Sequence, residues 1–239
     1  MSTRGGRERI LRAAMELIAR DGFDGVRIAD IAERADVSTA AVHYHFATRP
    51  QLLTASLTFC LEAAEAWLKR QAQSESRTLP AQRLADLIDF GLPLTPGDAM
   101  EWRLWHELER HAARSTDLAR TLSALYERLL EPYRAVIGDG LDDGVFHDCE
   151  PQESATAALA LLTGLATRLL AHDPAFTHEQ ARTLAARQLA RIVGFSGPLP
   201  LQPLIAQQED IMAGPVSTQD APKAPVTRRR RAPRSGSSS

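Results

Sequence analysis

Apolar residues recur every three or four positions along most of the chain, which is the spacing of one face of an α-helix. The first such segment predicts a helix over about residues 7–21, followed by Gly22 where a left-handed glycine often ends a helix. Its apolar face consists of Ile10, Leu11, Ala14, Leu17 and Ile18. Because no segment alternates between apolar and polar residues as a half-buried strand does, the pattern predicts an all-α fold of about nine helices.

Two short helices are predicted next, at about residues 28–34 and 38–46, with Ser38 able to cap the second through its hydroxyl. Helices this close together predict a helix-turn-helix over about residues 27–46, which forms a three-helix head with the first helix. We expect one small apolar core here, built from Ile28, Ile31, Val37, Val42 and Phe46. The opposite face of the second short helix would stay free, and a helix of this size fits the major groove of DNA. That face carries Thr39, Ala40, His43 and Tyr44.

Six further helices are predicted, at about residues 52–68, 84–91, 102–108, 118–133, 155–170 and 177–193. Pro93 and Pro96 separate the second from the third, and we expect Pro132 to bend or interrupt the fourth. An acidic turn is expected at 138–150. The last helix begins with Thr177 and Gln180 at the spacing of a capping box.

The composition divides the chain into three parts. Residues 1–49 form the predicted helix-turn-helix head, and residues 50–197 form a helical bundle. Residues 198–239 are rich in Pro, Ser, Gln and Arg, so we expect a largely disordered tail that contains a basic cluster at 227–234.

The formal net charge of −2 would, taken alone, argue against a nucleic-acid-binding protein. The charge is unevenly distributed, however. Residues 1–49 hold 8 basic and 7 acidic side chains, residues 50–222 hold 14 and 23, and residues 223–239 hold 6 and none. An acidic middle therefore hides a near-neutral head and a basic tail.

Other classes of protein find little support in the sequence. The N-terminus lacks the apolar stretch of a signal peptide, the longest weakly polar run (155–167) is too short to span a bilayer, and two cysteines fit a reducing cytoplasm. No metal site is expected, because His106 and His111 are five positions apart on a helix and the turn at 147–150 is more typical of a solvated acidic loop. Since no paired acid and base, nucleophile or phosphate loop is evident, we predict neither an enzyme nor a cofactor.

The head resembles that of the TetR family of bacterial transcriptional regulators over about residues 7–55. The resemblance rests on Val42-His43-Tyr44-His45-Phe46, the following Arg49 and Leu52-Leu53, and the Gly22-Phe23 turn. It implies that Thr39, Ala40 and His43 face DNA bases, and that phosphates are held by Ser38, Tyr44, His45 and Arg49. In two places the chain departs from the family: Arg27 stands where Thr is usual and could contact a phosphate, and Asp36 stands where Gly is usual in the turn.

The bundle resembles, more loosely, the C-terminal domain of the choline-responsive BetI-like branch, although Thr163 stands where an Asp is common. This resemblance implies a domain that binds a small-molecule effector and forms a homodimer through residues 155–170 and 177–193. The dimer would place two recognition helices about 34 Å apart on a pseudo-palindromic operator in double-stranded DNA. Candidate pocket residues are Phe90, Trp102, Trp105, His106, Tyr126 and Tyr133.

The sequence therefore predicts a cytoplasmic DNA-binding regulator, a repressor that a small molecule releases from its operator. Two alternatives stay open. One is a constitutive helix-turn-helix regulator without an inducer, and the other is a helical small-molecule-binding protein or enzyme in which the helix-turn-helix is incidental. The basic tail could add salt-sensitive attraction to DNA or be merely solvated.

Overall fold

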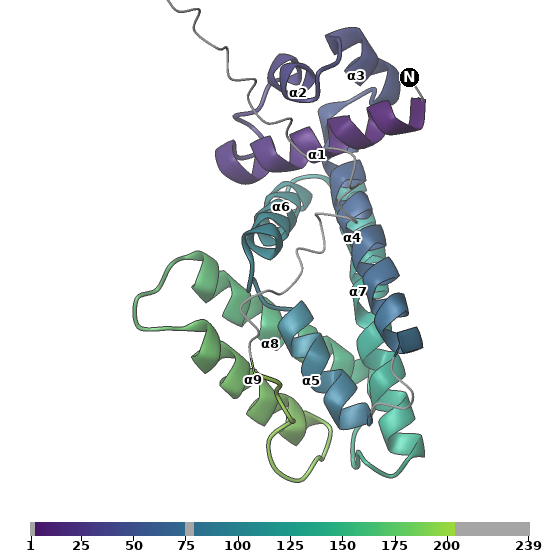
Figure 1. Ribbon diagram of the computed structural model, residues 1–239, viewed down its shortest axis with the longest axis vertical. Coiled ribbons are helices and arrows are strands. Elements are labelled where there is room, and N and C mark those ends of the chain that lie inside the picture. The colour runs from purple at the N-terminus through teal and green to yellow at the C-terminus, as the bar shows by residue number, and fades with distance from the viewer. Residues whose placement is uncertain (1–2, 75–78, 204–239) are drawn as a thin grey trace, which may run out of the picture.

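The computed structural model describes residues 3–74 and 79–203, and the regular secondary structure in these two ranges is entirely helical (Figure 1). The helices are α1 (Thr3–Asp21), α2 (Ile28–Arg34), α3 (Thr39–His45), α4 (Arg49–Ser74), α5 (Pro80–Phe90), α6 (Pro96–Ala112), α7 (Thr116–Asp142), α8 (Pro151–Leu170) and α9 (His178–Ile192). None of them is both long and apolar enough to cross a membrane. The prediction of an all-α fold is confirmed.

The first three helices form the head at one end of the molecule, above the ends of α4 and α6 (Figure 1). Ile31, Val42 and Phe46 are buried between these helices, with Ile28 and Val37 partly buried beside them, as expected. The turn between α2 and α3 closes through the Val37 N–H, which donates to the Ala32 carbonyl at 3.0 Å.

Capping residues set several helix boundaries. Ser38 Oγ accepts a hydrogen bond from the Ala41 N–H at 3.1 Å, and Thr177 and Gln180 form the expected capping box. Pro80, Pro96 and Pro151 each occupy the first turn of a helix, where the missing N–H costs nothing. These prolines begin helices as well as separating them.

Helix α7 is not interrupted at Pro132, although interruption is one of the two outcomes expected there, and it shortens the expected acidic turn. It runs from Thr116 to Asp142 without interruption, with Pro132 inside it. Leu130 and Tyr133 are buried on either side of the proline. Their packing keeps the helix continuous although the proline has no N–H to donate to the helix. The expected acidic turn at 138–150 is shorter, because residues 138–142 complete α7; there Gly140 leaves room for the buried Phe146 ring.

The buried apolar side chains form two clusters. The one that we call the upper core joins the head to α4, α6 and the first half of α7. The other, the lower core, joins α5, the second half of α7, α8 and α9.

The expected disorder from residue 198 onward is wrong for residues 198–203. Leu199 is buried in the lower core, and the Gln202 carbonyl accepts a hydrogen bond from Arg182 Nη2 at 2.7 Å. The rest of the predicted tail, with the basic cluster at 227–234, lies outside the described residues.

Candidate functional site

Helix α3 has one face that packs against the head and one face that is exposed, which we call its bare face. Its inner face buries Val42, and Phe46 follows as a buried C-cap. The outer face exposes Ser38, Thr39, Ala40, His43 and Tyr44, with His45 half-buried beside them. The Tyr44 side chain is 80% exposed, far more than packing would leave a tyrosine, so fold stability does not account for it. The structure thus brings together the predicted DNA-reading residues on one surface.

The two predicted arginines differ in their surroundings. Arg27 is exposed at the start of α2, where its own N–H donates to the Asp30 carboxylate at 3.2 Å. Arg49, at the start of α4, is exposed as well, but it contacts the head, since Nη2 donates to the Phe23 carbonyl and the guanidinium lies 4.9 Å from the centre of the Phe23 ring. Sequence reasoning did not anticipate this contact.

A network of ionic and hydrogen-bonded contacts joins the head to α6. The Phe23 N–H donates to Glu107 Oε2 at 2.8 Å, and Arg110 Nη2 lies 2.9 Å from both Glu107 Oε2 and Asp24 Oδ2. The His111 ring meets the Phe23 ring edge-on at 4.7 Å. We call Phe23, Asp24, Glu107, Arg110 and His111 the head clamp.

The carboxylates of the head clamp are held in their charged form. Burial alone would raise the pKa of Glu107, but the hydrogen bonds from Arg110 and from the Phe23 N–H outweigh burial and lower it. The Arg110 hydrogen bond likewise lowers the pKa of Asp24. Both pKa values are lower in the folded protein than in the unfolded chain. The clamp therefore stabilises the folded state fully above the ordinary carboxyl pKa of about 4, and this stabilisation is lost as the pH falls through the lowered values.

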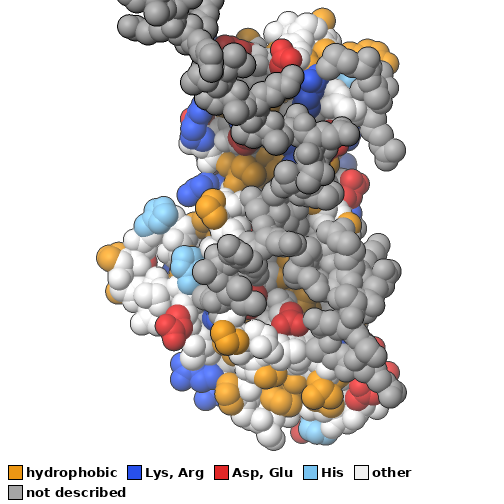
Figure 2. Space-filling model, in the orientation of Figure 1, with side chains coloured by type: hydrophobic (Ala, Val, Ile, Leu, Met, Phe, Trp, Pro, Cys, Tyr) orange, Lys and Arg blue, Asp and Glu red, His pale blue; other side chains and the backbone are white. Residues whose placement is uncertain are grey.

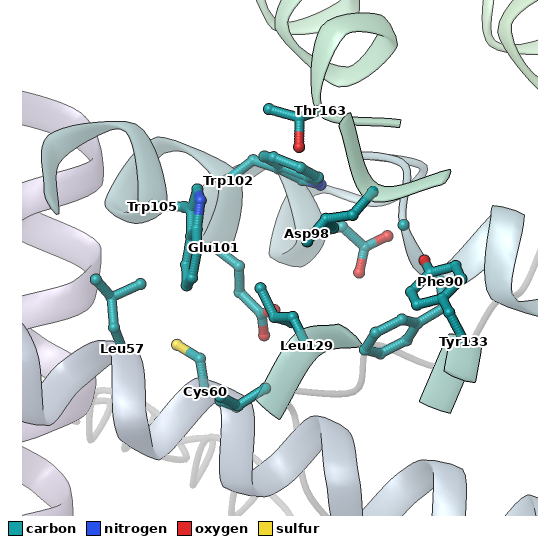
Figure 3. Close-up of a pocket in the computed structure, with 13 residues that line it drawn as sticks. Leu57, Cys60, Phe90, Asp98, Glu101, Trp102, Trp105, Leu129, Tyr133 and Thr163 are labelled. Carbon is teal, nitrogen blue, oxygen red and sulfur yellow. The ribbon is translucent and has the colours of Figure 1, made fainter. Parts of the chain in front are cut away.

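A cavity of about 90 Å³ lies among α4, α5, α6, α7 and α8 (Figure 3), large enough for several water molecules or one small ligand. The residues that line it are Leu57, Cys60, Leu61, Phe90, Gly91, Asp98, Glu101, Trp102, Trp105, Leu129, Tyr133, Leu159 and Thr163. Phe90, Trp102, Trp105 and Tyr133 are therefore at the pocket, as the sequence predicts.

His106 and Tyr126 do not line this cavity. The Tyr126 hydroxyl donates to Glu109 Oε1 at 2.5 Å, and its ring packs edge-on against Trp105 at 5.2 Å. Burial and the bond to Glu109 raise the pKa of Tyr126 to about 12. His106 lies against Trp102, with Nε2 3.4 Å from Thr167 Oγ1. Both residues pack against tryptophans of the lining without lining the cavity themselves.

The lining also contains two carboxylates that sequence reasoning missed. Asp98 and Glu101 come from successive turns of α6 and lie among the aromatic side chains in Figure 3. Asp98 also accepts the Thr95 N–H at 2.8 Å, which caps α6. The described lining includes no Lys or Arg, so the charged groups that it contributes are negative.

The fold and the site together define the class of helix-turn-helix transcriptional regulators. A model described as bacterial regulatory proteins, tetR family, matches residues 10–55, and one described as BetI-type transcriptional repressor, C-terminal, matches residues 80–194. Together they cover more than half of the chain, and the chain belongs to the TetR family.

Individual relatives agree with this assignment. The HTH-type transcriptional regulator BetI of Brucella melitensis is 28% identical over 123 residues, which span 52% of this chain and 61% of that protein. A transcriptional regulator from Saccharomonospora viridis, solved in complex with choline, has a TM-score of 0.69 and 28% identity over 77% of this chain and 95% of that one. A TetR-family regulator from Rhodococcus sp. has a TM-score of 0.70 and 26% identity over 80% and 99%.

Proposed function

We propose that the protein is a cytoplasmic repressor that binds a pseudo-palindromic DNA operator as a homodimer and is released by a small organic cation. It acts by binding and not by catalysis. The main observation behind the proposal is that α6 contacts both the cavity and the head. Its first half lines the cavity with Asp98, Glu101 and Trp102, and its second half contacts the head through Glu107 and Arg110.

The bare face of α3 supports the DNA part of the proposal. In this proposal, base edges are contacted by Thr39, Ala40 and His43. Phosphates are contacted by Ser38, Tyr44 and His45. Arg27 can add a phosphate contact from the start of α2. Arg49 is exposed, but its Nη2 is already bonded to the Phe23 carbonyl, so we rank it below Tyr44 as a phosphate contact.

The outer face of α8 supports a homodimer through α8 and α9. Small or short side chains lie exposed along α8, including Ala160, Gly164 and Thr167, and a Cβ added at Gly164 would meet nothing within 4 Å. Such a surface lets a second helix pair approach closely, and a two-fold dimer matches the symmetry of a pseudo-palindrome.

The cavity supports a ligand that is both cationic and apolar. Aromatic faces attract organic cations, and the carboxylates Asp98 and Glu101 favour a positive charge. Choline, bound by the regulator from Saccharomonospora viridis, has this chemistry. A constitutive regulator would need no such cavity, so the cavity also favours an effector over that alternative.

The experiment begins with DNA fragments that the protein enriches from a random library. Choline is then titrated against the complex, with 3,3-dimethylbutan-1-ol as its uncharged isostere, while tryptophan fluorescence and DNA release are followed. We expect choline to change the emission of Trp102 and Trp105 and to release the DNA, and the isostere to do neither. Glu101→Gln should weaken choline binding about tenfold. Enrichment of no sequence, or an equal response to both compounds, would contradict the proposal.

A further inference from the structure

The turn between α1 and α2 is fixed by α6 through its backbone. Gly22 adopts a φ of +73° and the Phe23 side chain is buried, which leaves the Phe23 N–H pointing out of the head. Glu107 accepts this N–H from a position 84 residues away. A backbone N–H held by a carboxylate is a strong and directional bond.

Apart from the hydrogen bond that Arg49 Nη2, at the start of α4, donates to the Phe23 carbonyl, the other contacts between the head and the bundle have little directionality. Helix α1 packs on α4 and α6 mainly through apolar side chains, and such packing resists separation more than rotation. Figure 1 shows the head resting on the upper ends of these two helices. The clamp on α6, together with the Arg49 contact from α4, therefore supplies the angular constraint that apolar packing lacks.

The charged groups of the clamp brace Glu107 itself. Arg110 bridges Glu107 to Asp24 at 2.9 Å to each, so the carboxylate is held from its own helix and from the head. The Phe23 ring is contacted from two helices. The centre of the His111 ring lies 4.7 Å from its centre, and the guanidinium carbon of Arg49 lies 4.9 Å from it. The Glu107 side chain is 20% exposed, and it is not one of the apolar side chains that form the upper core.

We propose that Glu107 is a positioning residue that sets the angle of the head and thereby the spacing of DNA half-sites that the dimer accepts. The proposal rests on the proposed function above, since spacing has meaning only for a dimer on two half-sites. Without the clamp, each head can rotate on its apolar contacts and follow half-sites that lie closer together or farther apart.

The first test measures affinity for the selected operator and for versions with one base pair added or removed between the half-sites. We expect Glu107→Ala to reduce the discrimination between these spacings about tenfold, the scale of one charge-assisted hydrogen bond. Glu107→Gln, whose amide oxygen can still accept the Phe23 N–H, should keep most of the discrimination. The matched control is Arg120→Ala, which removes an exposed ion pair with Asp117 that does not reach the head. A variant that merely loses stability would weaken binding at all spacings alike, and that result would overturn the proposal.

The second test needs no DNA and separates this proposal from the function on which it rests. Hydrogen exchange at the Phe23 N–H should be slow in the wild-type protein and in Glu107→Gln, and at least about tenfold faster in Glu107→Ala. Equal exchange in all three proteins would overturn the clamp even if an operator is found. Failure of the wild-type protein to select any operator would instead overturn the proposed function.

Discussion

The two hydrophobic cores divide the protein differently from the two domains that the sequence suggests. The predicted boundary between residues 49 and 50 falls at the start of α4, inside an upper core that runs from the head into α6 and α7. The cavity instead lies where the cores meet, since Trp105 belongs to the upper core and Tyr133 to the lower one. Under the proposed function, the regulatory boundary of this chain is the seam between its cores, where a bound ligand would shift one core against the other.

Truncating one large side chain in each core tests whether the two cores are separate units. Leu53 and Leu84 are both fully buried, Leu53 in the upper core and Leu84 in the lower one. Each change to Ala removes buried volume and should cost about 3 kcal/mol of unfolding free energy. Scanning calorimetry should show that Leu53→Ala lowers the melting temperature of one transition and Leu84→Ala that of another. A single transition that both variants lower equally would show that the cores unfold as one unit.

The head can be examined at a residue that belongs to neither core. Tyr44 is 80% exposed, so Tyr44→Ala should leave the melting temperature almost unchanged. We expect operator affinity to fall about tenfold, because one phosphate contact is lost. Tyr44→Phe, which keeps the ring and loses the hydroxyl, serves as the control and separates hydrogen bonding from packing on DNA. Undiminished retention on the operator would remove Tyr44 from the interface.

The outer face of the lower core can be tested at Gly164. Alanine has the higher helix propensity and the added Cβ meets nothing within 4 Å, so Gly164→Ala should stabilise the isolated chain by up to about 1 kcal/mol. If α8 packs closely against a second copy, the same methyl group weakens association. We expect sedimentation equilibrium to show a weaker dimer alongside a higher melting temperature at low concentration. An unchanged association constant would move the dimer contact away from Gly164.

The sequence predicts the head well because its determinants are local. Ser38 caps α3, Asp36 takes the left-handed conformation and Gly22 ends α1, each within a few residues of the side chains that it serves. Helical periodicity places the apolar residues correctly for the same reason. Once periodicity identifies the packed face of α3, the opposite side of the helix is identified as its bare face.

The sequence predicts the pocket and the clamp less completely because these depend on residues far apart in the chain. Aromatic residues suggest the pocket, but periodicity does not separate Trp105, which lines it, from Tyr126, which packs behind it. Glu107 looks like an ordinary helical glutamate until the fold brings Phe23 beside it. A charged residue on the buried side of a helix is the one local signal that could have marked Glu101 as a pocket residue.

The smallest effect is expected at Asp36, in the turn of the head, where φ is +52°. Glycine adopts this conformation freely, but it also loses more backbone entropy on folding, so Asp36→Gly should stabilise the head by only about 0.5 kcal/mol. Asp36→Ala is the matched control: alanine has neither the freedom of glycine nor a side chain that bonds locally, so it should destabilise by about 1 kcal/mol. Chemical denaturation of the two variants measures the difference. Two changes of the same sign would mean that the Asp36 side chain, and not its backbone, determines the stability of the turn.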